Sequence, residues 1–360
     1  MFTPQRLVLA RHRRGLTTFA LADACGMTTP QLADLERGHR APTMRQAAVL
    51  AQVLHVPPAF LTTTAPDPIP ATTLFLRPLP AFDHTGRHAA AAIAVLVTEI
   101  YRWIDQHIPL PDTDLPPLDG TDPATAAGIL RARRGLGTGP APSLPRLLDT
   151  HGVRLATLPL ERSAIGSFSF WHDATPYVVL DTTRTAAQRR HDAAHELAHL
   201  VLHRTRRHPR AEAERDADRF AAAFLLPEPG LRDRMPDTTH AGDVVADAES
   251  WRVAPLVLAH RLHDLAMLST DQYRAVCVDL VRADTPHHPT VLDAETSPQL
   301  DTVFAALSGR RHGLGVLAAG THLYRHDVAG LLLGLLTRDR HDVPRPTGAR
   351  PRLALVRTPR

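Results

Sequence analysis

The motif His-Glu-Leu-Ala-His at 195–199 combines two possible metal ligands with a carboxylate. On a helix, residues i and i+4 share one face, so the rings of His195 and His199 can bind one ion. Glu196 lies next to them, where its carboxylate could take a proton from a water that the ion activates. The motif therefore predicts a hydrolytic metal centre. A helix that carries buried or solvated histidines is the alternative.

The residues around the motif favour a helix. Thr185 and Gln188 form a Thr-x-x-Gln capping pattern, and neither Pro nor Gly occurs in 186–203. Leu197, Leu200 and Val201 supply an apolar stripe. A second helix is expected at Ala211–Leu226, with an apolar face formed by Ala217, Phe220, Ala221 and Phe224.

The second helix offers carboxylates for the same ion. A catalytic zinc site needs a third protein ligand and leaves its fourth position to water. At about 100° per residue, Glu214 and Asp218 border the buried face of this helix. Glu214 is therefore the best third ligand, and Asp218 could orient a ligand histidine through a hydrogen bond. Asp216 lies on the other border and is the weaker substitute.

The two predicted helices resemble those of the ImmA/IrrE family of bacterial metallopeptidases. The resemblance rests on the run from His191 to His203, followed by Glu-Arg-Asp-Ala-Asp-Arg-Phe at 214–220 and Leu-Leu-Pro at 225–227. It implies zinc-dependent proteolysis with His195, His199 and Glu214 as ligands and Glu196 as general base. Asp218 stands where many members have Asn, and Ala193 and Ala198 replace a common Thr and Gly. None of these differences affects a ligand.

A small sheet is expected just before the metal helix. The segments Val153–Leu160, Ser163–Trp171 and Pro176–Asp181 are rich in β-branched and aromatic residues. An edge strand of such a sheet could pair with an extended peptide substrate, and Ser163–Trp171 and Tyr177–Leu180 are both candidates. Tyr177 could contact an oxyanion, although a buried strand tyrosine is the alternative. His191 and His203 are rotated away from the metal axis and are predicted to be non-ligands.

The amino terminus carries a second set of signals. Thr17 can cap a helix over Thr18–Cys25, and Thr-Thr-Pro-Gln at 28–31 forms a capping box for a helix over Thr29–Arg37. Together with Gly15-Leu-Thr and Leu35-Glu-Arg-Gly, this pattern resembles the XRE family of helix-turn-helix domains, in which Arg11 and Glu36 match an internal ion pair. The predicted DNA-contacting residues are Thr18, Thr28, Thr29, Gln31, Asp34, Arg37 and Arg40.

Charge and composition agree with a double-stranded DNA partner. Residues 1–62 contain seven arginines against three carboxylates, and the chain of 360 residues has a net charge of +4. It contains neither Lys nor Asn, which we interpret as a compositional bias of the genome. Two cysteines and the lack of a signal peptide or membrane span predict a cytoplasmic protein with no membrane partner.

The expected fold is mainly α with a small β-sheet (α+β). We predict a helix-turn-helix at 1–62, a linker and amphipathic helix at 63–122, a zincin-like domain at 123–235, a helical region at 236–337 and a basic, disordered tail at 338–360. A homodimer is the default for XRE-type domains.

The functional hypothesis is a DNA-binding regulator that cleaves a partner protein through a Zn²⁺ site, with Mn²⁺ as an alternative metal. The resemblance implies a transcriptional repressor as substrate. The alternative is a non-proteolytic transcription factor or antitoxin that uses the second domain to sense a ligand or partner. Self-cleavage in the Thr/Pro-rich segment Thr62–Pro70 is a third possibility.

Overall fold

The computed structural model describes residues 1–76, 84–205, 209–235, 240–283 and 294–337. These residues form many helices around one small sheet, so the expected mainly-α fold with a small sheet is confirmed. The predicted tail at 338–360 lies outside the described residues. None of the described helices is long and apolar enough to cross a membrane.

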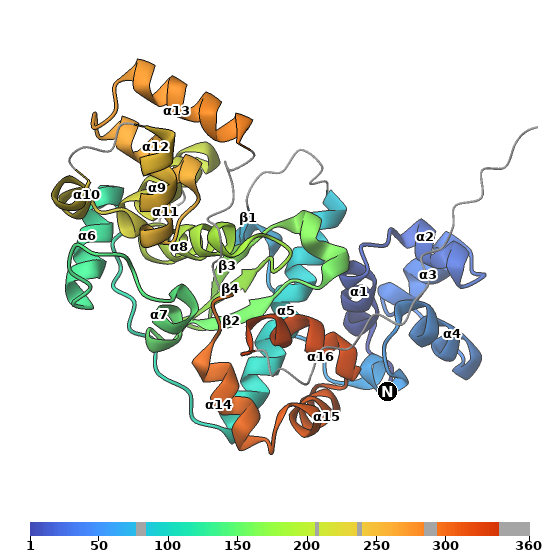
Figure 1. Cartoon of the computed structure of the whole chain (residues 1–360). Coiled ribbons are helices and arrows are strands. Elements are labelled where there is room, and N and C mark those ends of the chain that lie inside the picture. The colour runs from blue at the N-terminus through green and yellow to red at the C-terminus, as the bar shows by residue number, and fades with distance from the viewer. Residues whose placement is uncertain (77–83, 206–208, 236–239, 284–293, 338–360) are drawn as a thin grey trace, which may run out of the picture.

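The first helices form a compact bundle at one end of the molecule (Figure 1). They are α1 (Pro4–Arg13), α2 (Thr18–Ala24), α3 (Thr29–Glu36) and α4 (Met44–Leu54), followed by the 3₁₀ turn η1 (Pro58–Thr62). Thr17 caps α2, and the predicted capping box of Thr28 and Gln31 begins α3. Leu21, Leu32 and Leu35 are buried in the centre of this bundle.

One ion pair fixes α1 against α3. The guanidinium of Arg11 donates to both carboxylate oxygens of Glu36, at 2.5 and 3.1 Å, and to the carbonyl of Leu16. Both side chains are largely buried. A bidentate geometry of this kind fixes orientation as well as distance. The ion pair expected from the XRE resemblance is therefore present.

The sheet has the strand order β1-β3-β4-β2. Its strands are β1 (Phe75–Leu76), β2 (Arg154–Thr157), β3 (Phe168–His172) and β4 (Thr175–Leu180). β3 and β4 form an antiparallel hairpin, β2 runs parallel to β4, and β1 pairs antiparallel with β3. The two edges of the sheet are thus β1 and β2.

Two predictions for the sheet are wrong. The segment Ser163–Trp171 is not one strand: the 3₁₀ turn η3 (Leu160–Ile165) comes first, and Gly166, with φ +76°, separates it from β3. Neither of the two candidates is an edge strand, because β3 lies between β1 and β4, and β4 lies between β3 and β2. Strand order depends on pairings between distant residues, which local patterns do not encode.

Helices cover both faces of the sheet (Figure 1). On one face lie α8 (Ala186–Leu202) and α9 (Arg210–Leu225), packed against each other. On the other lies α5 (His84–His107), whose buried Tyr101 donates a hydrogen bond of 2.6 Å to the carbonyl of Leu155. The segment 63–122, expected to be a linker with one helix, thus also contributes β1 to the sheet and a covering layer through α5.

The remaining helices surround this centre. They are α6 (Pro123–Arg133), α7 (Leu144–Thr150), α10 (Glu228–Arg234), α11 (Ala241–Trp251), α12 (Pro255–Asp264), α13 (Thr270–Arg282), α14 (Pro298–Ala306), α15 (Arg310–Thr321) and α16 (Arg325–Leu332), with 3₁₀ turns η2 (Ala71–Thr73) and η4 (Leu333–Leu335). Within the described part of 236–337, where a helical region is expected, the structure has α11 to α16.

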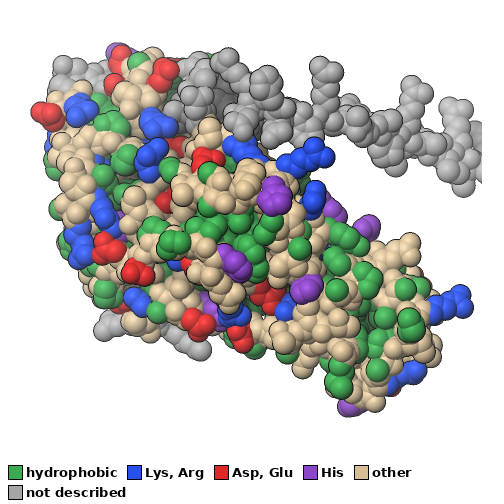
Figure 2. All heavy atoms as spheres, turned by 90° about the horizontal axis from the view of Figure 1, so that it is seen from below, with side chains coloured by type: hydrophobic (Ala, Val, Ile, Leu, Met, Phe, Trp, Pro, Cys, Tyr) green, Lys and Arg blue, Asp and Glu red, His purple; other side chains and the backbone are tan. Residues whose placement is uncertain are grey.

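The amino-terminal bundle is joined to the rest of the molecule through α1. Arg6 forms an ion pair of 2.7 Å with Glu99 of α5, and Arg13 one of 2.9 Å with Asp327 of α16. All four side chains are mostly buried. The face in Figure 2 carries positive and negative side chains interspersed, without one continuous basic region.

Candidate metal centre

Two histidines on α8 form the core of the site. Thr185 and Gln188 begin this helix with the predicted capping box. His195 and His199 lie one turn apart on the same face, and their Nε2 atoms are 3.2 Å from each other. Each residue is 2% exposed. The helix thus brings two imidazole nitrogens into contact inside the protein, as the spacing predicted.

Glu214 on α9 completes a set of three donor atoms. Its Oε2 lies 3.4 Å from Nε2 of His195, and its Oε1 lies 3.8 Å from Nε2 of His199. The three ligand atoms fall within 4.8 Å of one another. Oε2 is buried and makes no hydrogen bond. A divalent cation fits this set of two imidazoles and one carboxylate, because it would give the buried oxygen a partner. The same set of ligands occurs in catalytic zinc sites.

Asp218 lies behind His195. Its Oδ1 is 2.8 Å from Nδ1 of His195, so this nitrogen donates to the carboxylate and Nε2 is left to face a cation. Asp216 was the weaker candidate for the third ligand. Its Oδ1 lies 4.0 Å from Nη1 of Arg219. The structure thus places Asp218 beside a candidate ligand and Asp216 outside the cluster.

His203 takes a position that the sequence did not reveal. It is not among the converging donors, but its Nδ1 lies 2.9 Å from Nδ1 of His199. It can therefore orient His199 much as Asp218 orients His195. The one sequence feature that could have indicated this contact is the i+4 spacing, which continues from His199 to His203. The ring of His191 lies 6.4 Å from that of His195 between centroids, and His191 is also outside the donor set.

Glu196 points toward the sheet, about 100° around α8 from His195. The hydroxyl of Ser169 on β3 donates a hydrogen bond of 2.6 Å to Oε2 of Glu196, and the carboxylate is buried. Burial raises the pKa of Glu196 to about 8, against the attraction of His195 and the bond from Ser169. A carboxylate with a pKa near neutrality can both accept and return a proton. Ser169 was missed by sequence reasoning, because this contact spans 27 residues.

The carboxylates favour positive charge on His195. Burial acts to lower the pKa of His195, but the carboxylates of Asp218, Glu214 and Glu196 together outweigh it and raise the pKa to about 9. The same negative surroundings would stabilise a metal cation bound at Nε2. The electrostatics therefore agree with the geometry of the donor set.

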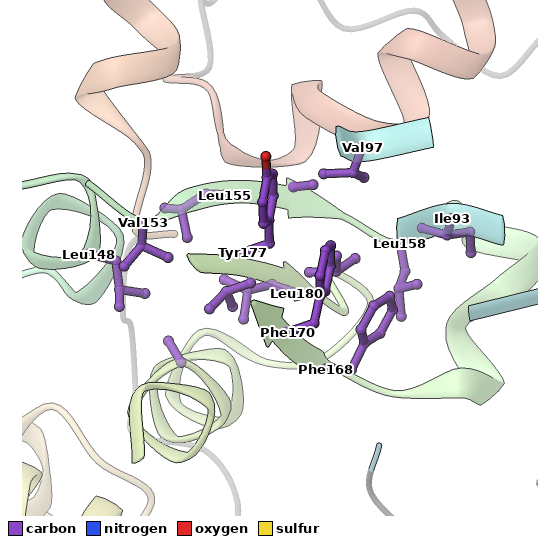
Figure 3. Packing of buried hydrophobic residues seen from close by; sticks show 14 of the residues in the cluster. Ile93, Val97, Leu148, Val153, Leu155, Leu158, Phe168, Phe170, Tyr177 and Leu180 are labelled. Atoms are coloured by element: carbon purple, nitrogen blue, oxygen red, sulfur yellow. The ribbon is translucent and has the colours of Figure 1, made fainter. Parts of the chain in front are cut away.

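Tyr177 is not near this cluster, which contradicts its predicted oxyanion contact. It lies on β4 opposite Phe170, and the two rings stack with centroids 4.8 Å apart. Figure 3 shows both rings, with Phe168, on the side of the sheet that faces Ile93 and Val97 of α5. Neighbouring strand residues point to opposite faces, so Tyr177 points away from α8. Burial raises its pKa to about 12.

A cleft of about 620 Å³ opens beside the metal cluster. Its walls include His199, His203 and Glu214 on one side and residues 71–76 on the other. Trp171 and Arg204 also line it, with the guanidinium carbon of Arg204 3.9 Å from the centre of the Trp171 ring. The cleft therefore lies between the helices of the metal cluster and the segment that carries β1.

Comparison with known protein families agrees with this geometry. Residues 148–263 match the family model of the IrrE N-terminal-like domain. This match includes β2 to β4, both helices of the metal cluster and α12, but neither β1 nor α5. Residues 5–61 match the family model of a helix-turn-helix domain. No curated protein matches the chain.

These matches confirm the two predicted resemblances. The chain joins a helix-turn-helix domain, which supports DNA binding, to an IrrE-like domain of a metallopeptidase family. This combination of domains supports a DNA-binding regulator that carries a metallopeptidase-like domain.

Six of the seven predicted DNA-contacting residues lie on α3 or close to its ends in the chain, and Thr18 is the first residue of α2. Thr28, Thr29, Gln31, Arg37 and Arg40 are exposed, and Asp34 and Thr18 are half-buried. Four of them pair with one another: the side-chain oxygen of Gln31 accepts from the backbone of Thr28 at 3.0 Å, and Asp34 forms an ion pair of 2.8 Å with Arg37. The hydrogen bond from Arg37 lowers the pKa of Asp34, so this carboxylate is neutralised by the pair rather than by protonation.

Proposed function

We propose that this protein is a DNA-binding transcriptional regulator whose second domain is a zinc-dependent endopeptidase, and that the peptidase cleaves a partner protein, a transcriptional repressor. The observation that carries the proposal is the convergence of His195, His199 and Glu214, with the buried carboxylate of Glu196 close enough to interact electrostatically with His195. A module that only binds a ligand has no need of Glu196 in this place.

In the proposed mechanism, His195, His199 and Glu214 hold the metal. A zinc ion held there would supply the Lewis acidity that makes a water molecule nucleophilic near neutral pH. Glu196 takes the proton of that water and returns it to the leaving nitrogen of the peptide. Ser169 holds Glu196 in position, while Asp218 holds His195 with its Nε2 toward the donor set. Zinc is preferred to manganese because two of the three donors are imidazoles.

The amino-terminal domain, 1–62 in this proposal, would place α3 in the major groove of double-stranded DNA, as a homodimer. Thr28, Thr29 and Gln31 lie at the start of α3, the end of a recognition helix that contacts base edges. Arg37 and Arg40 follow its end and can reach phosphates. The proposed peptidase spans 123–235, and α11 to α16 belong to the helical region that follows it.

The test uses cells of the source organism that produce the wild type, Glu196→Gln or Glu212→Gln. It compares the amino termini that proteolysis creates in the proteins of these cells. Glu212 is the matched control, because it is an exposed carboxylate on the same helix as Glu214. The proposal predicts a cleavage product with the wild type and with Glu212→Gln, and none with Glu196→Gln. Unchanged products and unchanged gene regulation in Glu196→Gln cells would favour the non-proteolytic regulator instead.

A further inference from the structure

The shortest strand of the sheet comes from the connection between the two matched domains. β1 consists of Phe75 and Leu76, which lie outside both family matches. It pairs antiparallel with β3, Phe75 opposite Ser169 and Leu76 opposite Phe168. Ser169 is also the residue that holds Glu196. β1 therefore lies along the strand that borders the reactive carboxylate.

Phe75 covers a candidate metal ligand. Its ring stacks on that of His199, with centroids 4.9 Å apart and planes inclined by 4°. Under this cover His199 and His195 are 2% exposed and Glu196 is 3% exposed. Of this group only His199 lines the cleft. A substrate carbonyl that must meet both the cluster and Glu196 thus finds Phe75 and its strand in the way.

The segment is held at several points. The guanidinium of Arg210, at the start of α9, donates to the carbonyl of Leu76, and the side chains of Leu74 and Leu76 are buried. Upstream, Arg6 donates to the carbonyl of Thr64 at 2.8 Å, and Asp67 pairs with Arg102 of α5 at 2.6 Å. A tethered strand meets β3 at a high effective concentration and competes well with a peptide that arrives from solution.

We propose that β1 occupies the position in which a substrate peptide pairs with β3, so that the chain's own linker keeps the peptidase site closed. The substrate then binds as an extended antiparallel strand, with a bulky apolar side chain where Phe75 lies against His199. This inference rests on the proposed peptidase function. Because β1 has only two residues, it can be exchanged for a longer peptide strand without unfolding the sheet.

The test measures binding of a fluorescent peptide with the sequence of residues 70–76 to the full-length chain by anisotropy. All proteins carry Glu196→Gln, so that no peptide is cut. The test protein adds Phe75→Gly and Leu76→Gly, which remove the blocking side chains. The matched control adds Thr72→Gly and Thr73→Gly, at two exposed positions of the same segment.

The expected result is at least tenfold tighter binding to the Phe75/Leu76 variant than to the parent and the control. Hydrogen exchange in residues 165–172 should be faster in that variant and should slow again when the peptide binds. Equal affinity for all three proteins, including no binding to any, would overturn the inference. Cleavage of the wild-type chain within residues 71–76 would also overturn it, because the segment would then be a substrate.

A failure of this inference and a failure of the proposed function give different results. Peptide binding without any cleavage product in cells would support the role of β1 and reject the peptidase function. A repressor cut in cells, together with no peptide binding to the open variant, would keep the peptidase and reject the role of β1.

Discussion

Asp218 on α9 accepts a hydrogen bond of 2.8 Å from Nδ1 of His195 on α8. The bond joins the two helices that supply the metal donors and fixes which nitrogen of His195 faces the cluster. Its consequences can be measured separately from any peptidase activity.

Asp218→Ala should weaken metal binding by about 10–100-fold, because an imidazole without its hydrogen-bond partner is a poorer and less ordered ligand. Asp218→Asn should lose less, since its side-chain oxygen can still accept from Nδ1. Competition with a coloured chelator measures both. Asp216→Ala is the control and should bind metal like the wild type, and an equal loss in that variant would contradict the assigned role of Asp218.

Ser169→Ala should lower the turnover of the peptidase by about tenfold while leaving metal content and KM unchanged. The variant loses one hydrogen bond to a charged group, worth about 1.5 kcal/mol, which positions Glu196. Turnover and KM are read from cleavage of the identified substrate. A change in KM alone would mean that Ser169 acts on β3 rather than on the carboxylate.

Asp149, which is not part of the metal cluster, should make the stability of the fold depend on pH. Burial raises its pKa to about 6, although Ser297 and the backbone of Gln299 donate hydrogen bonds to it. An acid whose pKa is higher in the folded state stabilises the fold below the unfolded pKa, and this contribution is lost as pH rises through the folded pKa. The free energy of unfolding of the wild type relative to Asp149→Asn should therefore fall by about 2 kcal/mol between pH 4 and pH 7. Denaturant titrations at several pH values test this, and a constant difference would contradict it.

Arg40→Ala should weaken binding to duplex DNA of any sequence and reduce the slope of log affinity against log salt by about one. Arg40 is exposed just beyond α3, where it can contact one phosphate. Fluorescence anisotropy at several salt concentrations measures the slope. Arg274→Ala on α13 is the control for lost charge, and an equal change in slope there would show that the effect is not local to the amino-terminal domain.

The convergence of the metal donors was predictable from the sequence because their geometry is helical and local. The i+4 spacing placed His195 and His199 together, and the apolar face of α9 indicated the direction of Glu214 and Asp218. The capping boxes at Thr28 and Thr185 were predictable for the same reason, since each joins residues three apart.

The contacts that cross between elements were not predictable. Ser169 and Glu196 are brought together by packing of β3 under α8, and Tyr177 was wrongly assigned because alternation does not say which face of the sheet meets α8. β1 has only two residues, too few for any periodic signal. The pairing with β3 and the stacking of Phe75 on His199 appear only in the folded chain.

Metal content tests the central claim most directly. Elemental analysis should find about one zinc per chain in the wild type and in Glu196→Gln, because Glu196 is not among the donors, and almost none in His195→Ala/His199→Ala. Circular dichroism confirms that each protein is folded. A folded wild type, purified without chelators, that contains neither zinc nor manganese would contradict the account.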